Sequence, residues 1–286
     1  MDDRNANRMM AFLKRRPDFL IVGAQKAGTT ALQIYLSQHP RIQCAVKKEV
    51  NFFKHDKFYG RGEAWYARQF PRRWRPGVLL FEATPGYLYF PFVADRIREF
   101  DPRIKLIMLL RNPVERAYSA WNMFRLVHQD AKMKAEVLEE FYEVANPDIR
   151  RSNLDLLNSP VFPDFLACVQ EEIARFQAGD APVEDPGFVR RGIYWEQVQR
   201  FYQRFPRENI LILETNELRT GRAASLNRVL RLLNLPPYDW NNVDLKEENQ
   251  HRYDMKMTDS TRRLLRDFFQ PHNEKLYSII GRDFSW

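Results

Sequence analysis

The sequence predicts an α/β fold, in which a mostly parallel sheet is flanked by helices on both faces and carries an inserted layer of helices. Short segments typical of strands recur along the chain, and amphipathic helical segments lie between them. Strands that alternate with helices favour parallel pairing, because each connection must cross back over the sheet. The strands are expected at residues 19–22, 42–46, 78–81, 104–110 and 210–213.

The composition is compatible with one large domain. The 286 residues are 44% hydrophobic and 14% aromatic, which is enough apolar material for a substantial core. We interpret residues 1–17 as a polar leader and residues 18–286 as a single domain. Residues 131–189 contain short helical patterns broken by prolines, and we expect them to form a helical insertion.

The charge balance favours an anionic ligand but not a nucleic acid. Lysine and arginine number 45 against 37 acidic residues, for a net charge of +8, yet no compact basic run stands out. The longest aliphatic run, Leu106–Leu110, is too short for a membrane span. We therefore expect no nucleic-acid partner and no membrane span, and the oligomeric state stays open.

The cysteines and the N-terminus favour a cytoplasmic location. Cys44 and Cys168 by themselves can build neither a disulfide framework nor a structural zinc site, and no other cluster has metal-ligand spacing. The first residues are polar and lack an apolar signal core. We expect reduced thiols in the cytoplasm and no metal; the Golgi lumen would apply only if an anchor preceded this sequence.

A glycine loop follows the first expected strand. Gly23 ends the apolar run 19–22, Gly28 follows, and a helical pattern begins at Thr29 and Thr30. In a strand–loop–helix unit of this kind, loop amides and the helix dipole hold an anion. The alternative is an ordinary strand-to-helix turn. Such a turn needs glycines but neither a lysine in the loop nor two threonines at the helix start.

The loop departs from the nucleotide-binding motif G-x-x-x-x-G-K-[ST] at one position. Thr30 stands where that motif has Ser or Thr, but Thr29 stands where it has lysine. The only lysine in the loop is Lys26, inside the turn. A lysine there would meet an anion at the loop mouth rather than lie along a triphosphate. The loop therefore suits a phosphate-like group better than ATP with magnesium.

The next elements can be placed by their breakers and apolar patterns. His39-Pro40 ends the first helix, and residues 54–77 are predicted as helix and loop. The buried strand at 104–110 ends at Arg111, and Pro113 suits the first turn of the following helix. One face of that helix is apolar and predicts a buried stripe of Val114, Ala117, Tyr118, Trp121 and Phe124.

The C-terminal part is predicted to be mostly helical. Residues 223–233 form a helical pattern, and an irregular stretch follows at 236–258. Two helices are expected after it, and the second starts near Pro271 and ends at Gly281.

Ligands of open parallel sheets bind at the carboxyl ends of the strands. This rule places the loop at 23–30, Glu82 and Arg111 on one rim. The guanidinium of Arg111 can present two N–H groups to a phosphate, and Ser119 on the next helix can add a hydroxyl. The alternative is a solvated serine and an arginine in an ion pair with a nearby carboxylate, either Glu115 or Asp95.

Five motifs together resemble the sulfotransferase family, and most closely the heparan sulfate 3-O-sulfotransferases and their bacterial relatives. In chain order they are VGAQKAGTT from Val22, KEVNFF from Lys48, FEATPGYLY from Phe81, LRNPVERAYSAW from Leu110 and IIGRDFSW from Ile279. Each motif alone is moderately specific, and all five in order are highly specific. The resemblance covers about residues 18–286 and is weakest in 131–189.

The resemblance implies a P-loop-like fold and transfer of the sulfuryl group of 3′-phosphoadenosine 5′-phosphosulfate (PAPS) to a hydroxyl or, less readily, an amine. By position, Arg111 and Ser119 would bind the 3′-phosphate, and Glu49 matches the catalytic base. A loop that closes over the nucleotide matches His251, Arg252 and Tyr253. The 5′-phosphosulfate would be held by Gln25, Lys26, Ala27, Gly28, Thr29 and Thr30, with Lys26 neutralising charge during transfer.

Two positions depart from the heparan sulfate branch. A lysine of that branch, in the turn after the strand, is Ala83 here, and a glycine of its closing loop is His251. Both departures argue against a heparan-type acceptor, but neither affects the residues matched to PAPS. We therefore expect a neutral or weakly anionic hydroxyl on a carbohydrate, a small molecule or a carrier. The segment 131–189 is expected to cover the acceptor.

The chemistry itself requires few groups. Sulfuryl transfer needs in-line positioning, stabilisation of the leaving phosphate and a base for the acceptor hydroxyl, without a required magnesium ion. Glu49 is the first candidate for the base, and the alternatives are His55, His251 and Glu82. Two other functions stay open at this point. A glutamate at a strand end also suits a P-loop kinase or NTPase, and the basic charge suits a non-catalytic binder of anionic glycans.

Overall fold

The computed structural model describes residues 16–71, 77–142, 154–179, 186–241 and 255–286. The chain divides into two compact units. Unit 1 comprises Met1–Leu110 and Arg200–Gln250, and unit 2 comprises Arg111–Gln199 and His251–Trp286. The single-domain organisation with its insertion stays a prediction.

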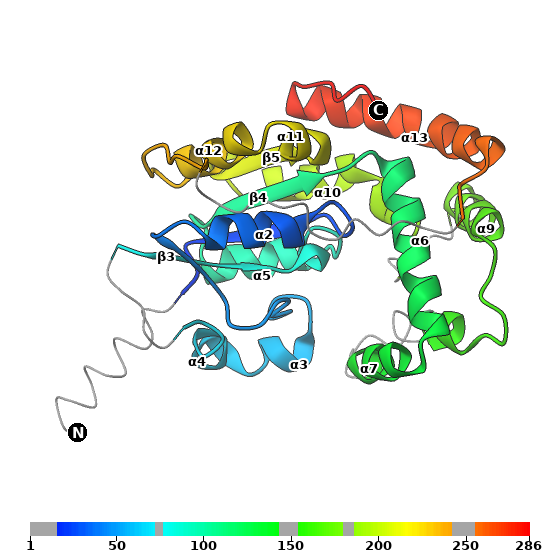
Figure 1. Cartoon of the computed structure of the whole chain (residues 1–286), viewed down its shortest axis with the longest axis horizontal. Helices are drawn as coiled ribbons and strands as arrows, with labels where there is room; N and C mark the ends of the chain where they lie inside the picture. The colour runs from blue at the N-terminus through cyan, green and yellow to red at the C-terminus, as the bar shows by residue number, and fades with distance from the viewer. Residues whose placement is uncertain (1–15, 72–76, 143–153, 180–185, 242–254) are drawn as a thin grey trace. The chain divides into compact units, whose positions relative to one another are not determined.

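Unit 1 contains a five-stranded sheet (Figure 1) in which every neighbouring pair is parallel. The strand order is β2-β3-β1-β4-β5. Strands β1 and β4 lie in the middle and are buried almost throughout, which explains their continuous apolar sequences. The strands are β1 (Phe19–Gly23), β2 (Ile42–Cys44), β3 (Leu79–Ala83), β4 (Lys105–Leu110) and β5 (Ile210–Glu214).

Helices flank this sheet and confirm the predicted α/β fold. Helix α2 follows β1, and α5 connects β3 to β4; right-handed crossovers in opposite directions place these two helices on opposite faces. Helices α11 and α12 follow β5 and pack against it. The helices of unit 1 are α2 (Thr29–Ser37), α3 (Asp56–Tyr59), α4 (Gly62–Ala67), α5 (Val93–Phe100), α11 (Thr215–Thr220) and α12 (Arg222–Leu232), with short 3₁₀ turns η1 (Pro85–Tyr87) and η3 (Arg207–Asn209).

Strand β2 is shorter than predicted. It ends at Cys44, and the side chain of Val46 is 76% exposed rather than half-buried. The backbone N–H of Ala45 still donates to Phe81, but that of Val46 donates to the carbonyl of Gln69, after α4. The prediction of a strand to residue 46 is wrong because the chain turns away from β3 at this point.

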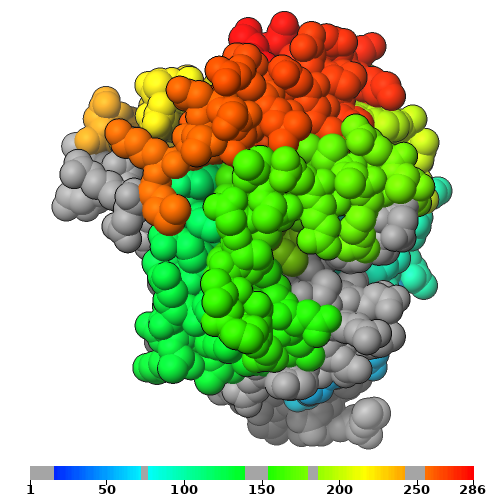
Figure 2. All heavy atoms as spheres, turned by 90° about the vertical axis from the view of Figure 1, so that its right-hand side faces the viewer, coloured from blue at the N-terminus to red at the C-terminus, as the bar shows by residue number. Residues whose placement is uncertain are grey.

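Unit 2 is helical, and its core forms around α6. All five residues of the predicted stripe on this helix are buried, together with Phe165, Val169 and Phe269 from other helices. Figure 2 shows α13, in orange and red, lying along the green helical part of the same unit, and α13 contacts both α6 and α9. The helices are α6 (Pro113–Gln129), α7 (Ala131–Tyr142), α9 (Phe165–Gln177), α10 (Tyr194–Tyr202, which ends in unit 1) and α13 (Asp259–Ile280), with the 3₁₀ turn η2 (Arg190–Gly192). Within the described residues, no helix combines the length and apolar character needed to cross a membrane.

The C-terminal region forms one helix rather than the predicted two. Helix α13 continues through Pro271, which lies on its exposed side. Proline costs a helix one backbone hydrogen bond, and burial on the opposite face offsets this cost. The buried positions Leu265, Phe269 and Leu276 continue on both sides of the proline. The proline was therefore a poor indicator of a helix boundary, because the apolar stripe does not stop there.

A glutamate organises an irregular turn in unit 2. The carboxylate of Glu172 accepts backbone N–H bonds from Phe188 and Val189, each at 2.6 Å, and from Arg190 at 3.2 Å. Desolvation raises the pKa of Glu172, and these three donated bonds act against that shift. From the other side, the fully buried Arg116 donates to the carbonyl of Phe188. Side chains thus provide hydrogen-bond partners for both N–H and C=O groups of the backbone in this turn.

Candidate functional site

The loop after β1 lies at the switch point of the sheet. The chain leaves β1 toward one edge of the sheet and leaves β4 toward the other. In open parallel sheets, ligands bind where neighbouring strands diverge in this way. The N–H of Ala24 donates to the carbonyl of Leu109 at 2.7 Å, which fixes the start of the loop on β4.

The backbone of this loop is arranged for close approach by an anion. Lys26 has φ of 65° and Gly28 has φ of 98°, both in the left-handed region. Turns of this kind direct backbone N–H groups toward a common point, where they hold an anion. A left-handed conformation costs a lysine roughly 1–2 kcal/mol, which a glycine avoids. The loop therefore stores strain at Lys26, the one lysine that the sequence places there.

Helix α2 begins at this loop without a side-chain cap. Its first residue follows Gly28, no side chain accepts from its first-turn N–H groups, and its first turn contains no acidic residue. By contrast, Asn112 caps α6 and Asp164 caps α9 through their side-chain oxygens. Uncapped N–H groups at a helix start bind anions, and the helix dipole adds to this attraction.

The loop also contains a buried hydrogen-bond acceptor. Among the described residues, the side-chain carbonyl oxygen Oε1 of Gln25 has no hydrogen-bond partner although it is buried. Buried polar atoms are normally paired, and this acceptor needs an N–H or O–H donor, which the oxygens of a sulfate group do not supply. The left-handed turn and the uncapped helix are what make the loop residues 24–30 fit a phosphate or sulfate group.

Thr215, which the sequence analysis missed, fixes the far end of the loop. Its hydroxyl Oγ1 lies 2.7 Å from the carbonyl oxygen of Ala27 and 2.9 Å from that of Leu110. One side chain from the start of α11 thus joins the loop to the end of β4. Because these partners are far apart in the sequence, no local motif points to this residue.

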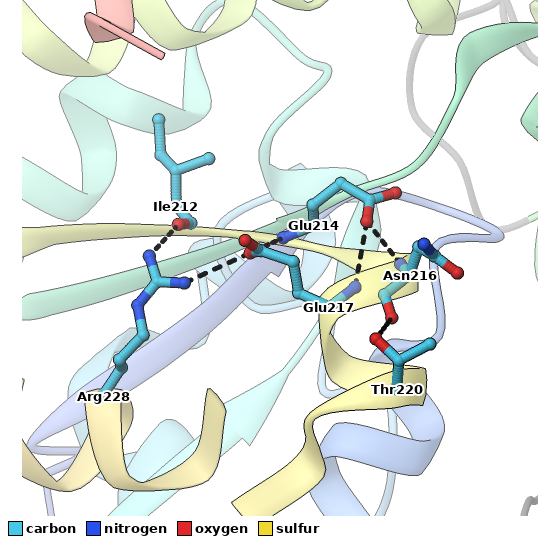
Figure 3. A network of polar contacts seen from close by, with 6 residues as sticks. All are labelled: Ile212, Glu214, Asn216, Glu217, Thr220 and Arg228. Carbon is cyan, nitrogen blue, oxygen red and sulfur yellow. Dashed lines mark hydrogen bonds and ion pairs between the residues drawn. The ribbon is translucent and has the colours of Figure 1, made fainter. Parts of the chain in front are cut away.

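Figure 3 shows how the residues around Thr215 are held. The carboxylate of Glu214 accepts from the N–H groups of Asn216 at 2.5 Å and Glu217 at 3.0 Å. In return, the carboxylate of Glu217 accepts from the N–H of Glu214 at 3.3 Å, which completes a capping box. Arg228 bridges Glu217 and the carbonyl of Ile212, so α12 supports the same corner.

Glu49 lies in the segment after β2 and is accessible. Its side chain is 40% exposed, and one oxygen lies 3.4 Å from the ammonium of its neighbour Lys48. An exposed carboxylate can reach a substrate hydroxyl, as a general base must. The structure is therefore compatible with the predicted role, which stays a prediction.

Glu82, on β3 of the same unit, has the opposite environment. Its side chain is 1% exposed, and it accepts hydrogen bonds from the hydroxyls of Tyr66, Tyr87 and Thr84 at 2.6–2.7 Å. Burial raises the pKa of Glu82, and the hydrogen bonds act in the opposite direction. A carboxylate enclosed by three hydroxyls suits a structural role better than the alternative role of base.

Two further positions of unit 1 that the sequence singles out, His55 and Ala83, are also buried. His55 is 4% exposed, and its ring lies edge-on to Phe58 with 5.5 Å between the ring centres. Ala83, where the heparan sulfate branch has lysine, is buried at the end of β3. Burial makes His55 a weaker candidate for the base than Glu49.

Arg111 and Ser119 belong to unit 2, whereas the loop, Glu49 and Glu82 belong to unit 1. Arg111 follows β4 directly, and its carbonyl accepts the hydroxyl of Tyr194 at 3.0 Å. Ser119 is 3% exposed on α6, so the alternative of a solvated serine is wrong.

The two carboxylates considered as alternative partners of Arg111 form ion pairs with other arginines. Glu115 pairs with Arg262, and Asp95 pairs with Arg204 at 2.8 Å. The predicted residues His251, Arg252 and Tyr253 lie outside the described residues.

Comparison with known proteins places this site in context. Residues 16–262 match the family model described as a sulfotransferase domain. The chain is 26% identical over 321 residues to the membrane-associated sulfotransferase kil1 of Dictyostelium discoideum, covering 94% of this chain and 66%, just under two thirds, of that protein. It is 26% identical over 299 residues to human heparan sulfate glucosamine 3-O-sulfotransferase 5, covering 98% and 76% of the two chains. Among solved structures, a sulfotransferase from Alicyclobacillus acidocaldarius aligns with a TM-score of 0.66 at 26% identity, covering 94% and 98%.

Proposed function

The chain belongs to the sulfotransferase family, and from this premise we propose that it transfers the sulfuryl group of PAPS to a hydroxyl group of its acceptor. The observation that carries the proposal is the left-handed turn at Lys26 and Gly28 in front of the uncapped helix α2. PAPS would supply an activated sulfuryl group and an anionic leaving group. The loop offers the matching positive potential without a bound cation.

Within the loop, backbone and side chains have different tasks. We assign contacts with the 5′-phosphosulfate to Gln25, Ala27, Gly28, Thr29 and Thr30. Lys26 adds a full positive charge, and a charge-assisted hydrogen bond contributes about 1.5–3 kcal/mol. Lys26 lies within the loop, where its backbone is left-handed. Its ammonium is therefore our candidate for neutralising charge on the sulfuryl oxygens during transfer.

We assign the 3′-phosphate of the nucleotide to Arg111 and Ser119. The support is the family resemblance, and Ser119 is buried on α6 rather than solvated. Arg252 and Tyr253 are assigned to the loop that closes over the nucleotide, on the resemblance alone.

Glu49 is the proposed general base. It would accept the proton of the acceptor hydroxyl as the oxygen attacks sulfur, and its exposure leaves it accessible for this step. His251 is the second candidate. The buried His55 and Glu82 are disfavoured by their enclosed positions.

The acceptor is the least constrained part of the proposal. The human relative is described as acting on heparan sulfate glucosamine. For this chain we propose a hydroxyl on a carbohydrate, a small molecule or a carrier, neutral or weakly anionic because Ala83 replaces a cation of that branch. We further propose that residues 131–189 contact the acceptor and that the protein acts in the cytoplasm.

Transfer of labelled sulfate from PAPS to a panel of acceptors tests this function. The panel contains heparan fragments, neutral oligosaccharides, hydroxyacyl carriers and small alcohols. Labelling of one of the last three classes is expected. Labelling of heparan fragments alone would contradict the proposed acceptor, and a kinase or NTPase would instead turn over ATP with magnesium and leave PAPS intact.

A further inference from the structure

The segment that follows Glu49 is buried but has no regular secondary structure. Val50, Asn51, Phe52 and Phe53 are each at most 5% exposed, and Asn51 has a left-handed φ of 58°. Neither strand nor helix pairing is available to the backbone at residues 49–51. Since an unpaired buried N–H is costly, the partners of these N–H groups determine where the segment lies.

Two of these N–H groups lead to the same carboxylate, each through one hydroxyl. The N–H of Asn51 donates to Oγ1 of Thr84, and the N–H of Phe53 donates to the hydroxyl of Tyr87, each at 3.3 Å. The hydroxyls of Thr84 and Tyr87 in turn donate to Glu82, at 2.6 and 2.7 Å.

The direction of these bonds depends on the carboxylate. Each hydroxyl donates its single proton to Glu82 and accepts the backbone N–H through a lone pair. Burial raises the pKa of Tyr87 well above its usual range, which keeps this phenol protonated as a donor. Removing the carboxylate would leave both hydroxyls free to rotate away from the N–H groups.

The turn after β3, which contains Thr84 and Tyr87, is attached to the strand that leads into the anion loop. The N–H of Thr84 donates to the carbonyl of Ile21 at 3.1 Å, and that of Leu88 donates to Val22 at 2.7 Å. The network around Glu82 therefore relates the backbone after Glu49 to the end of β1. Such a link matters for transfer reactions, because a displacement of about 1 Å in a catalytic group costs about 10²-fold in rate.

We propose that Glu82 is a positioning residue that sets the place of the Glu49 carboxylate, with the hydroxyls of Thr84 and Tyr87 as its two relays to the backbone. This inference rests on the proposed role of Glu49 as the general base. It assigns to Glu82 neither contact with substrate nor proton transfer.

Two tyrosines provide a matched pair of variants. Tyr66 and Tyr87 both donate to Oε1 of Glu82 at 2.7 Å, and burial raises the pKa of both phenols. Within the described residues, a backbone N–H of the segment 50–53 donates to Tyr87 but none donates to Tyr66. Tyr66→Phe therefore removes a donor to the carboxylate and leaves the relay intact, whereas Tyr87→Phe removes both.

The expected result is a loss of kcat of about tenfold or more in Tyr87→Phe, with KM for PAPS within about twofold of wild type. Tyr66→Phe should retain kcat within about twofold. Thr84→Val should behave like Tyr87→Phe, and Thr84→Ser, which keeps the hydroxyl, should restore kcat. Equal kcat values in the two tyrosine variants, at equal melting temperatures, would overturn the inference.

A double-mutant cycle separates this inference from the proposed function. In a Glu49→Gln background, Tyr87→Phe should cause no further loss of kcat, because the group that it positions no longer acts as a base. If Glu49→Gln lowers kcat and Tyr87→Phe lowers it by the same factor in both backgrounds, the positioning role is wrong while the base stands. If Glu49→Gln is fully active, the base assignment itself fails and the positioning role fails with it.

Discussion

The anion loop at residues 24–30 and the segment at 49–53 are held in place by opposite means. The loop is shaped by its own backbone, by left-handed residues and by bonds to the adjacent strand β4. The segment is held by side-chain hydroxyls 33 and 34 residues away in the sequence. The difference teaches that a candidate site for a charged group can be encoded locally, whereas the placement of the proposed general base depends on tertiary structure.

This comparison predicts different responses to substitution. Changes in the loop should act on binding, because the loop supplies amides and one charge to the anion. Changes around Glu49 should act on turnover, because a general base, the role proposed for Glu49, matters only when the acceptor reacts.

The largest effect is expected from Glu49→Gln. This change keeps the shape of the side chain and removes its basicity, so kcat should fall by about 10²–10⁴ while binding of PAPS persists. Steady-state kinetics and calorimetry on the same variant check both parts. Weakened nucleotide binding with unchanged kcat would reverse the roles of the two regions.

A smaller effect of the opposite kind is expected from Lys26→Ala. Loss of one charge-assisted contact should weaken nucleotide binding about 10- to 150-fold. Arg111→Ala should give a loss of the same order at the 3′-phosphate. Lys47→Ala is a control for net charge, because this exposed lysine lies outside the loop. Equal losses in Lys26→Ala and the control would show that overall charge, not the loop, binds the nucleotide.

The smallest effect concerns Cys44, which connects the strand before the Glu49 segment to the helix after the loop. This residue ends β2, before the Glu49 segment, and its Sγ accepts from Nε2 of Gln33 on α2 at 2.9 Å. Burial raises the pKa of Cys44 to about 11, so the thiolate forms only as the pH rises toward that value. Iodoacetamide should label it at pH 8 about 10²-fold more slowly than a free thiol. Rapid labelling would mean that the thiol is exposed and the link between the regions is weak.

Local patterns predicted much of the fold. The apolar strands, the glycine loop and the stripe on α6 were identified correctly, because each is set by neighbours in the sequence. The predictions at Val46 and Pro271 were wrong because contacts outside the local sequence decide the structure there. The chain leaves the sheet at Val46 for a partner at Gln69, and α13 continues past Pro271 because its buried face does.

The site was predicted less completely than the fold. The loop residues and Glu49 lie in motifs, but Thr215 and the hydroxyl of Tyr66 meet their partners only after folding. The sequence makes Glu82 an alternative candidate for the base, and its burial among hydroxyls favours a structural role instead. A polar side chain within an otherwise apolar strand, as at Glu82, indicates a residue of this kind. It does not identify the partner of that side chain.

Calorimetric titration with adenosine 3′,5′-bisphosphate, the product nucleotide of PAPS, tests the central claim most directly. With EDTA in excess, we expect saturable binding at one site per chain, weakened at least tenfold in Lys26→Ala. The same titration with ATP and magnesium, without EDTA, should give much weaker binding. Tight binding of ATP with magnesium and no binding of the bisphosphate would contradict a PAPS-dependent sulfuryl transfer by this chain.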